Sequence, residues 1–93
     1  MKYLQMDTIG KKIVLRVGMD ISGASVLRIH YEKPSGTKGS WTATAESARS
    51  ISHTLAASDL DEAGVWKVQP YAVVGDEAIY GDIERFEAKE NLS

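Results

Sequence analysis

Apolar and polar residues alternate with a period of two along most of this chain. Ile13, Leu15 and Val17 show the pattern, because each is separated from the next by one residue that would face the opposite way. Such alternation is typical of strands with one buried face, and turn residues separate the segments every ~8–12 residues. We therefore predict seven strands, at residues 3–6, 11–18, 26–33, 40–45, 50–55, 66–74 and 78–88.

The last two of these segments each carry an irregularity. In the final segment, Ile79 and Phe86 fall on opposite parities, so one extra residue near Glu84, a β-bulge, is needed to turn both side chains inward. In the segment before it, Pro70 lacks the amide hydrogen that a central strand position requires. We therefore expect that strand to lie at a sheet edge or to contain a bulge.

The length of 93 residues allows a single domain, spanning 1–93, with one modest core. One sheet of this size cannot bury its own apolar face, so two sheets must meet as an antiparallel β-sandwich, with a small closed barrel as the alternative. Trp41, Trp66 and Tyr31 fall on inward parities and are expected in the core. The stretch 58–64 has the acids and final glycine of one helical turn, and we expect the chain to cross between the sheets there.

Composition excludes several partners and chemistries. The chain carries 11 basic and 13 acidic residues, a net charge of −2, which gives no electrostatic footprint for nucleic acid or for a membrane. The absence of cysteine excludes disulfides, thiolate nucleophiles and cysteine-type zinc sites. No apolar run approaches the ~18 residues of a membrane span, and the N-terminus lacks the apolar region of a signal peptide. A small basic patch could still form from Lys11, Lys12, Arg16 and Arg28.

The two histidines are the first candidates for metal ligands. His30 lies on a polar parity and is expected to be exposed, whereas His53 lies on an inward parity and is expected to be a hydrogen-bonded core or rim side chain. Asp59 or Asp61 could supply a further ligand, but the histidines lack the close, paired spacing of zinc sites. We therefore predict no metal site at either histidine.

The stretch 59–64 is similar to the start of a calcium loop. An EF-hand requires glutamate at the twelfth loop position, and Pro70 stands there, so an EF-hand is excluded. The favoured interpretation is a solvated turn. A looser site stays open as an alternative, built from the acids Asp59, Asp61, Asp76 and Glu77.

The sequence lacks the signatures of common catalytic sites. No Gly-x-Ser-x-Gly elbow occurs, and the acidic residues are scattered over turns and outward positions. Acid–base catalysis needs two carboxyl groups held in one pocket, and nothing in the sequence places such a pair. We predict that the protein is not an enzyme and has no cofactor.

Three stretches of the chain resemble a known family. They are Asp-Ile-Ser-Gly-Ala-Ser at 20–25, Arg-Ile-His-Tyr-Glu-Lys-Pro-Ser-Gly at 28–36, and Asp-Leu-Asp-Glu-Ala-Gly-Val-Trp-Lys-Val-Gln at 59–69. These turn-and-strand patterns are similar to the immunoglobulin-like N-terminal domain of phage baseplate upper proteins and related virion proteins, over roughly residues 11–88. The resemblance implies an immunoglobulin-like antiparallel β-sandwich of about seven strands. Baseplate upper proteins are usually longer, so this chain would correspond to the docking domain alone.

The same resemblance implies a function. It is that of a non-enzymatic structural protein of a tailed bacteriophage particle, docked on other virion proteins as a baseplate or tail accessory protein or as a capsid decoration protein. Several symmetric copies would be present, and the location would be the virion, after assembly in the host cytoplasm. Exposed aromatic and arginine side chains are common interface anchors. We expect partner contacts at Tyr3, Arg28, Tyr71, Tyr80 and Arg85.

The alternative function is a small carbohydrate- or ligand-binding β-sandwich module. Tyr71 and Tyr80 fall on outward parities and could line a sugar-binding surface. An exposed aromatic platform with polar side chains beside it would distinguish this function from the structural one.

Overall fold

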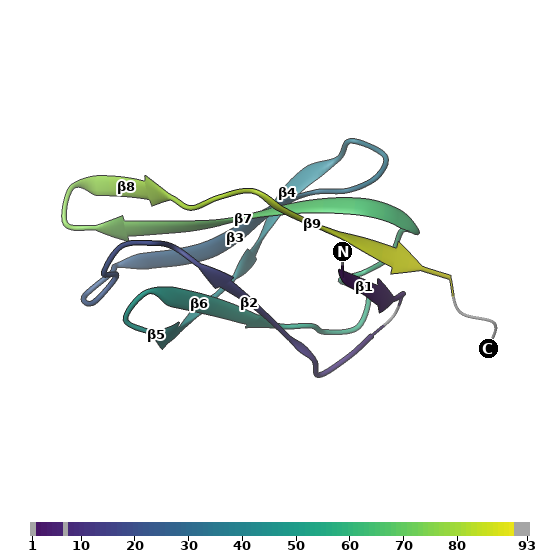
Figure 1. Cartoon of the computed structure of the whole chain (residues 1–93), viewed down its shortest axis with the longest axis horizontal. Coiled ribbons are helices and arrows are strands. Elements are labelled where there is room, and N and C mark those ends of the chain that lie inside the picture. Colours follow the sequence, from purple (N-terminus) through teal and green to yellow (C-terminus); the bar gives the residue numbers. More distant parts are fainter. Residues whose placement is uncertain (1, 7, 91–93) are drawn as a thin grey trace.

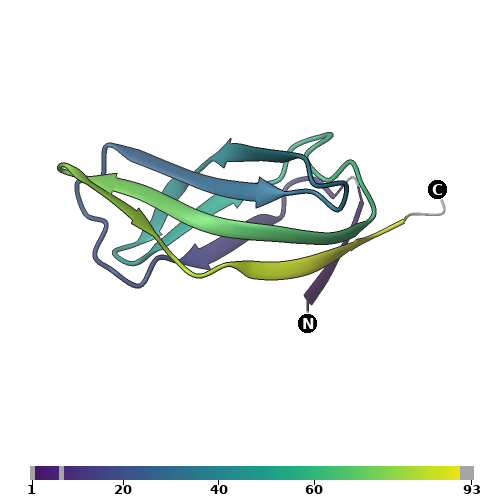
Figure 2. The same ribbon diagram turned by 90° about the horizontal axis from the view of Figure 1, so that it is seen from above.

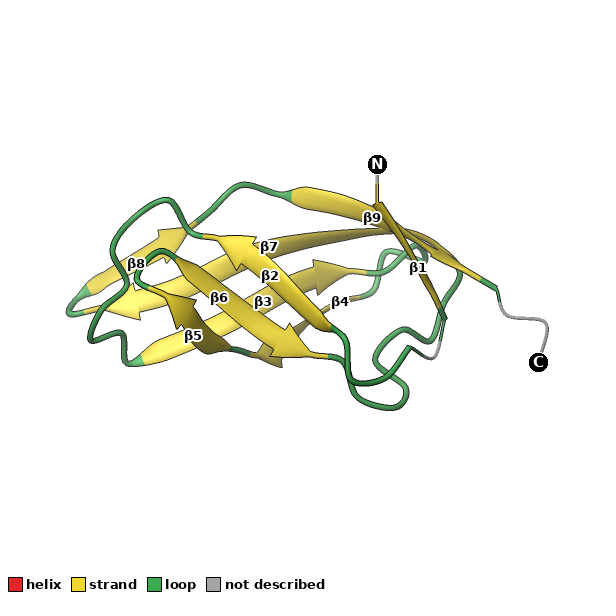
Figure 3. Cartoon of the chain, turned by 60° about the horizontal axis from the view of Figure 1, so that its bottom comes forward, coloured by secondary structure: helices red, strands yellow, loops and turns green. Residues whose placement is uncertain are grey.

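The computed structural model describes residues 2–6 and 8–90, and strands make up the regular secondary structure of these two ranges (Figure 3). In the described part, no helix is long and apolar enough to cross a membrane. The strands are β1 (Lys2–Gln5), β2 (Lys12–Arg16), β3 (Val26–Glu32), β4 (Lys38–Thr42), β5 (Thr44–Ser47), β6 (Ser50–Thr54), β7 (Gly64–Val74), β8 (Glu77–Tyr80) and β9 (Glu84–Lys89).

The strands form two sheets that face each other (Figures 1 and 2). The larger sheet has the order β1-β9-β7-β3-β4, with β8 paired to β7 as well, and the smaller sheet has the order β2-β6-β5. β1 runs parallel to β9, and the other pairs are antiparallel. The fold is an all-β sandwich of the immunoglobulin-like type, as predicted. A closed barrel is excluded because each sheet ends in edge strands of its own.

Two of the predicted strands are each divided in the structure. The strand predicted at 40–45 is divided at Ala43, where the chain leaves β4 in the larger sheet and enters β5 in the smaller sheet. The Ala43 amide donates to the Leu27 carbonyl at 3.1 Å, which ties this crossing to β3. The strand predicted at 78–88 is divided at residues 81–83. A full break between β8 and β9, and not a bulge near Glu84, therefore reverses the inward parity.

Pro70 lies in the middle of β7, which is a central strand of the larger sheet, so the predicted edge position or bulge is wrong. β3 pairs with one side of β7, while β8 and β9 share the other side. The Pro70 carbonyl accepts a hydrogen bond from the Gly81 amide at 3.0 Å. The side of Pro70 that lacks a donor therefore faces the break between β8 and β9, where no ladder hydrogen bond is needed.

Four rings stack through the core from the larger sheet to the smaller one. Their order is Phe86, Trp66, Trp41 and His53, with neighbouring centroids 6.1, 6.0 and 4.9 Å apart. Trp66 is fully buried and Trp41 nearly so, and Tyr31 packs against both indoles. The predicted core positions are therefore confirmed. Since each indole buries ~150–250 Å², this stack accounts for much of the apolar contact between the two sheets.

The segment 55–63 connects β6 in the smaller sheet to β7 in the larger one. The crossing between sheets is therefore confirmed, but it is an irregular loop and not a helical turn. Gly64 begins β7 with a φ of 127°, a region that favours glycine, and a Cβ atom there would come within 2.8 Å of Pro34. The loop 55–63 thus ends in close contact with the hairpin that joins β3 and β4.

Candidate functional site

The outer face of the larger sheet, the side turned away from the smaller sheet, carries the candidate site. Trp66, Val68 and Ala72 are buried at alternate positions of β7, so the positions between them face outward. The strand register aligns the outward positions into three rows across the sheet. These are the aromatic row of Arg28, Tyr71 and Tyr80, the middle row of Ser40, His30 and Gln69, and the cation row of Lys38, Glu32, Lys67 and Arg85.

The aromatic row presents one exposed ring, backed by two others. The Tyr71 and Tyr80 rings lie 4.9 Å apart, and the His30 ring meets that of Tyr71 edge-on at 5.0 Å and that of Tyr80 at 6.0 Å. Tyr80 is 57% exposed, whereas Tyr71 and His30 are half-buried. Edge-on and tilted ring pairs of this kind are mutually attractive. The two inner rings therefore hold the Tyr80 ring in place at the surface.

His30 corrects one of the sequence expectations. We expected an exposed side chain, but the ring is half-buried next to Tyr71 and Tyr80. Its Nε2 atom is buried and has no hydrogen-bond partner in the described part of the chain. A buried polar atom without a partner costs free energy, and the contacts of this ring with Tyr71 and Tyr80 offset part of that cost.

A hollow of about 230 Å³ opens over the middle and cation rows. Gly39, which also lines the hollow, leaves room for the phenol ring of Tyr31, because a Cβ atom at Gly39 would overlap that ring. Gln69 donates from Nε2 to the Gly81 carbonyl at 2.9 Å, which fixes the strand break beside the hollow. Strand irregularities often occur next to functional sites because they redirect side chains. The side chains around the hollow include His30, Glu32, Lys38, Lys67, Gln69 and Ile83.

The cation row gives this face its electrostatic character. Lys67 and Glu32 form a loose ion pair at 4.0 Å, and both are partly exposed. Lys38 pairs in register with Glu32 on one side, and Arg85 pairs in register with Lys67 on the other. The row therefore holds three basic side chains against one acid, so positive charge predominates at the edge of the hollow.

The structure brings together four of the five residues that we predicted for partner contact. Arg28, Tyr71 and Tyr80 share the aromatic row, and Arg85 ends the cation row. Tyr3 lies in β1 opposite Glu87 in register, and its side chain lies outside the described part of the structure.

Sequence reasoning missed four residues of the same face. The available signal was parity, because positions two apart in a strand share a face: His30 lies two positions from Arg28, and Gln69 and Lys67 lie two and four positions from Tyr71. Lys38 faces Glu32 across the sheet, which only the strand register shows. The prediction selected tyrosine and arginine because these residue types are common interface anchors, and it therefore left out the other residues. The missed residues are His30, Lys38, Lys67 and Gln69.

A second hollow, of about 360 Å³, lacks the chemistry of the first. It lies between the turn after β2 and the residues around β5, and it has no ionisable side chain in its lining. A few hydroxyl groups are its only polar side chains, so it offers little to orient a polar ligand. The lining residues are Ile21, Ser22, Gly23, Ala24, Leu27, Ala45, Ser47 and Ala48.

The outer face of the smaller sheet carries polar groups that bind one another. Glu46 accepts a hydrogen bond from the Ser52 hydroxyl at 2.9 Å and pairs with the Lys12 ammonium at 3.2 Å. These two contacts, the Ser52 bond first, hold the pKa of the Glu46 carboxyl below its usual value. The Val14 side chain beside them is 49% exposed. The most charged cluster of this face is therefore already occupied by contacts within the protein.

His53 is hydrogen-bonded at the rim of the core, as predicted. Its Nδ1 atom lies 2.9 Å from the Thr42 carbonyl, and its Nε2 atom lies 2.8 Å from Oδ2 of Asp59. Asp59 Oδ2 also accepts the Ala56 amide at 2.8 Å. Both ring nitrogens and the carboxylate thus have partners within the protein, which gives this pair a structural role.

The described residues contain no cluster of three or more side chains suited to hold a metal ion. The looser site that stayed open as an alternative would need four acids close together, and the structure does not bring them together. Asp59 and Asp61 lie in the loop 55–63, whereas Asp76 and Glu77 lie at the β7–β8 turn at the opposite end of the sandwich (Figure 1).

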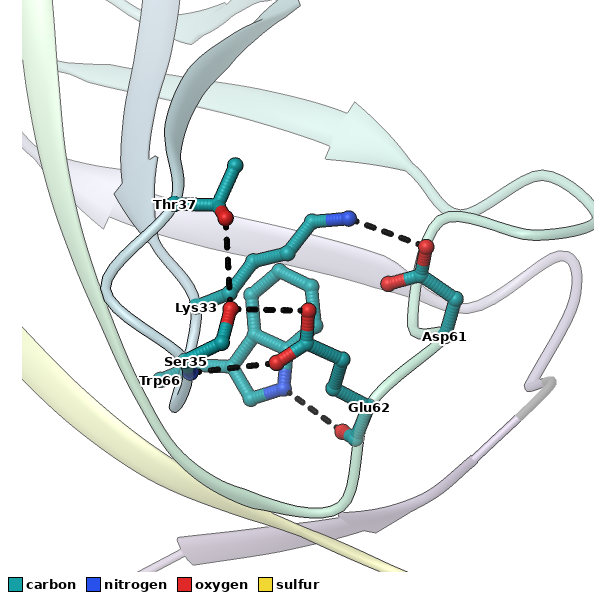
Figure 4. Close-up of polar contacts among 6 residues, drawn as sticks. All are labelled: Lys33, Ser35, Thr37, Asp61, Glu62 and Trp66. Carbon is teal, nitrogen blue, oxygen red and sulfur yellow. Dashed lines mark hydrogen bonds and ion pairs between the residues drawn. The ribbon is translucent and has the colours of Figure 1, made fainter.

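A second polar cluster, which we call the loop clamp, joins the loop 55–63 to the β3–β4 hairpin (Figure 4). Lys33 Nζ lies 2.9 Å from Oδ2 of Asp61, and the two oxygens of Glu62 accept the Ser35 amide at 3.1 Å and its hydroxyl at 3.0 Å. Trp66 Nε1 donates to the Glu62 carbonyl at 3.0 Å. The bond to Asp61 raises the pKa of Lys33.

Comparisons with known proteins identify the fold but no family. No family model matches the chain, and no curated protein matches it in sequence. Among solved structures, CopC from Methylosinus trichosporium OB3b is similar, with a TM-score of 0.62 and 13% sequence identity. The similarity covers 100% of this chain and 89% of that one. At this identity it shows a shared β-sandwich fold and nothing finer.

This similarity corrects the predicted function. We predicted a structural protein of a tailed phage particle, but the solved structure that this chain resembles is CopC, and that finding contradicts the prediction. The sequence resemblance to phage proteins, the partners and the virion location are not tested by it and stay predictions.

Proposed function

We propose that this protein is a non-catalytic ligand-binding module that binds a saccharide on the outer face of the larger sheet. The observation that carries the proposal is the exposed Tyr80 ring, backed by Tyr71 and His30, beside a hollow lined by hydrogen-bonding side chains. The likeness to CopC supports the class of small ligand-binding β-sandwich.

The chemistry of this face suits a sugar ring. One side of a pyranose ring presents C–H groups, which can pack on an aromatic ring, while its edges carry hydroxyl groups that need donors and acceptors. Tyr80 supplies the ring, since 57% of its surface is exposed. Gln69 and Glu32 supply amide and carboxylate groups at the hollow, and Lys67 adds a donor. Both requirements are thus met within one sheet face.

The other polar clusters support this choice of site because their polar groups already bind one another. His53 and Asp59 bind each other and the backbone, and the loop clamp joins two loops through mutual contacts. A ligand at either place would have to displace bonds already made. On the outer face of the larger sheet, by contrast, the ion pair between Lys67 and Glu32 is long, at 4.0 Å, and both side chains are partly exposed.

The test is a titration of the ¹⁵N-labelled protein with a panel of neutral and acidic trisaccharides, followed by amide chemical shifts. We expect shifts at residues flanking Tyr80, Tyr71 and Gln69. The variant Tyr80→Ala should weaken binding by about two- to tenfold, since stacking on one ring is worth ~0.5–1.5 kcal/mol. The control is Val14→Ala, because Val14 is exposed on the opposite face. Absence of shifts at about 10 mM saccharide, above even weak dissociation constants, would overturn the proposal.

A further inference from the structure

We infer that the saccharide bound on this face is anionic, a uronate-type oligosaccharide whose carboxylate lies over the cation row. This inference rests on the proposed function and adds the charge of the ligand. It comes from three features of the outer face: its charge balance, the placement of acids elsewhere, and the distance between its rows.

The charge balance of the three rows differs from that of the whole chain. The rows hold four basic residues and one acid, Glu32, whereas the chain as a whole carries a net charge of −2. Positive charge thus predominates along these rows, and Lys38 and Lys67 bring it to the hollow itself. Because like-charged groups held close together repel each other, such a concentration is best balanced by an anionic ligand. The four basic residues are Arg28, Lys38, Lys67 and Arg85.

Acidic residues gather at the two ends of the sandwich. Asp59, Asp61 and Glu62 lie in the loop 55–63, and Asp76 and Glu77 lie at the β7–β8 turn. A long polyanion with a charge on every unit, such as single-stranded nucleic acid, would meet this negative charge at both ends. A short oligosaccharide would stay within the positive rows. The placement of acids therefore favours a short anionic saccharide over nucleic acid.

The distance between rows sets the size of the ligand. Tyr71 and Lys67 are four residues apart on β7, which corresponds to ~13 Å along a strand. A single sugar ring cannot both stack on the aromatic row and place its carboxylate on the cation row. We therefore expect a ligand of at least two units, with one ring on Tyr80 and the carboxylate of another beside Lys67. The middle row would contact the linkage between them.

The experiment compares each acidic trisaccharide with its own methyl ester. Trimers of galacturonate, mannuronate and glucuronate are titrated into the labelled protein, and the esterified forms serve as neutral ligands of the same shape. We expect at least one free acid to bind about tenfold more tightly than its ester at low salt. That preference should shrink as salt is raised, because exposed charges are screened. Ester binding should change little with salt.

Charge variants assign the preference to the cation row. The double variant Lys67→Gln with Arg85→Gln should bring the affinity for the free acid down to that for the ester, and it should lower ester binding much less, because glutamine keeps a hydrogen-bond donor at each position. The control is Lys11→Gln with Lys12→Gln, which removes the same charge at the start of β2 in the smaller sheet. An equal loss in the control would show that net charge alone acts, and would overturn the inference.

The remaining outcomes separate the inference from the proposed function. Equal binding of acid and ester, still lost in Tyr80→Ala, would overturn the inference and leave the proposed function standing. Absence of binding by every trimer would overturn both. A short oligothymidylate that binds more tightly than any trimer, through Tyr80 and Lys67, would replace the saccharide by single-stranded nucleic acid.

Discussion

The loop clamp and the outer face of the larger sheet are both rich in polar side chains, but they differ in where those side chains find partners. In the clamp, Lys33 binds Asp61, and Glu62 binds Ser35 through both carboxylate oxygens. On the outer face, the ion pair between Lys67 and Glu32 is stretched to 4.0 Å. Polar groups that satisfy one another stabilise the fold, whereas polar groups with weak internal contacts remain available to a ligand. The two regions should therefore respond oppositely to substitution.

The largest effect on stability is expected on the clamp side, at Trp66. This side chain is fully buried in the ring stack, and its Nε1 atom donates to the Glu62 carbonyl. Trp66→Ala should lower the free energy of unfolding by about 3–5 kcal/mol, measured by urea denaturation. Trp66→Phe, which keeps a ring in the stack, is the matched control and should cost less. A cost below about 1 kcal/mol for the alanine variant would contradict the role given to the stack.

The next largest effect is expected at the pair of His53 and Asp59. Asp59→Ala would leave both His53 Nε2 and the Ala56 amide without their acceptor, which typically costs about 1–3 kcal/mol. A double-mutant cycle with His53→Ala should give a coupling of about 0.5–3 kcal/mol, because the side chains are in direct contact. Saccharide binding by Asp59→Ala should equal that of the parent protein. If Asp59→Ala lost saccharide binding while its free energy of unfolding stayed unchanged, the binding site would lie at the pair of His53 and Asp59.

A much smaller effect on stability is expected on the outer face. Tyr80 is 57% exposed and contacts only the edge of the aromatic cluster, so Tyr80→Ala should change the free energy of unfolding by about 0.5 kcal/mol or less. The same variant should show the largest loss of saccharide binding. A destabilisation above about 2 kcal/mol would mean that this ring serves the fold, and the contrast between the two regions would fail.

The features that could be predicted from the sequence are those that depend on the pattern within one strand. Alternation places Trp41 and Trp66 inside and Tyr71 and Tyr80 outside, since parity in a strand needs no knowledge of its neighbours. The two-sheet sandwich follows because those inward faces must be covered. These expectations depend on local pattern, and the structure confirms the core and the sandwich.

The features that the sequence could not show depend on register and on contacts between distant segments. His30 looks exposed by parity, yet cross-strand pairing places it against Tyr71 and near Tyr80. The position of Pro70 is tolerated only because its partner strand breaks at residues 81–83. The grouping of Lys67 with Arg85 likewise requires the β7–β9 register. The alternation of residues within one segment does not reveal the register between two segments.

The smallest expected effect is the pH dependence of the clamp, and its sign can be stated. The bond to Asp61 raises the pKa of Lys33 above its ordinary value of 10.5. A raised pKa in the folded state contributes stability that is fully present below pH 10.5 and is lost as the pH rises through the folded-state pKa. The melting temperature of the parent protein should therefore exceed that of Lys33→Met at neutral pH, and the difference should shrink above pH 10.5. A difference that stayed constant across this range would show that Lys33 stabilises through its packing against Trp66, and not through its charge.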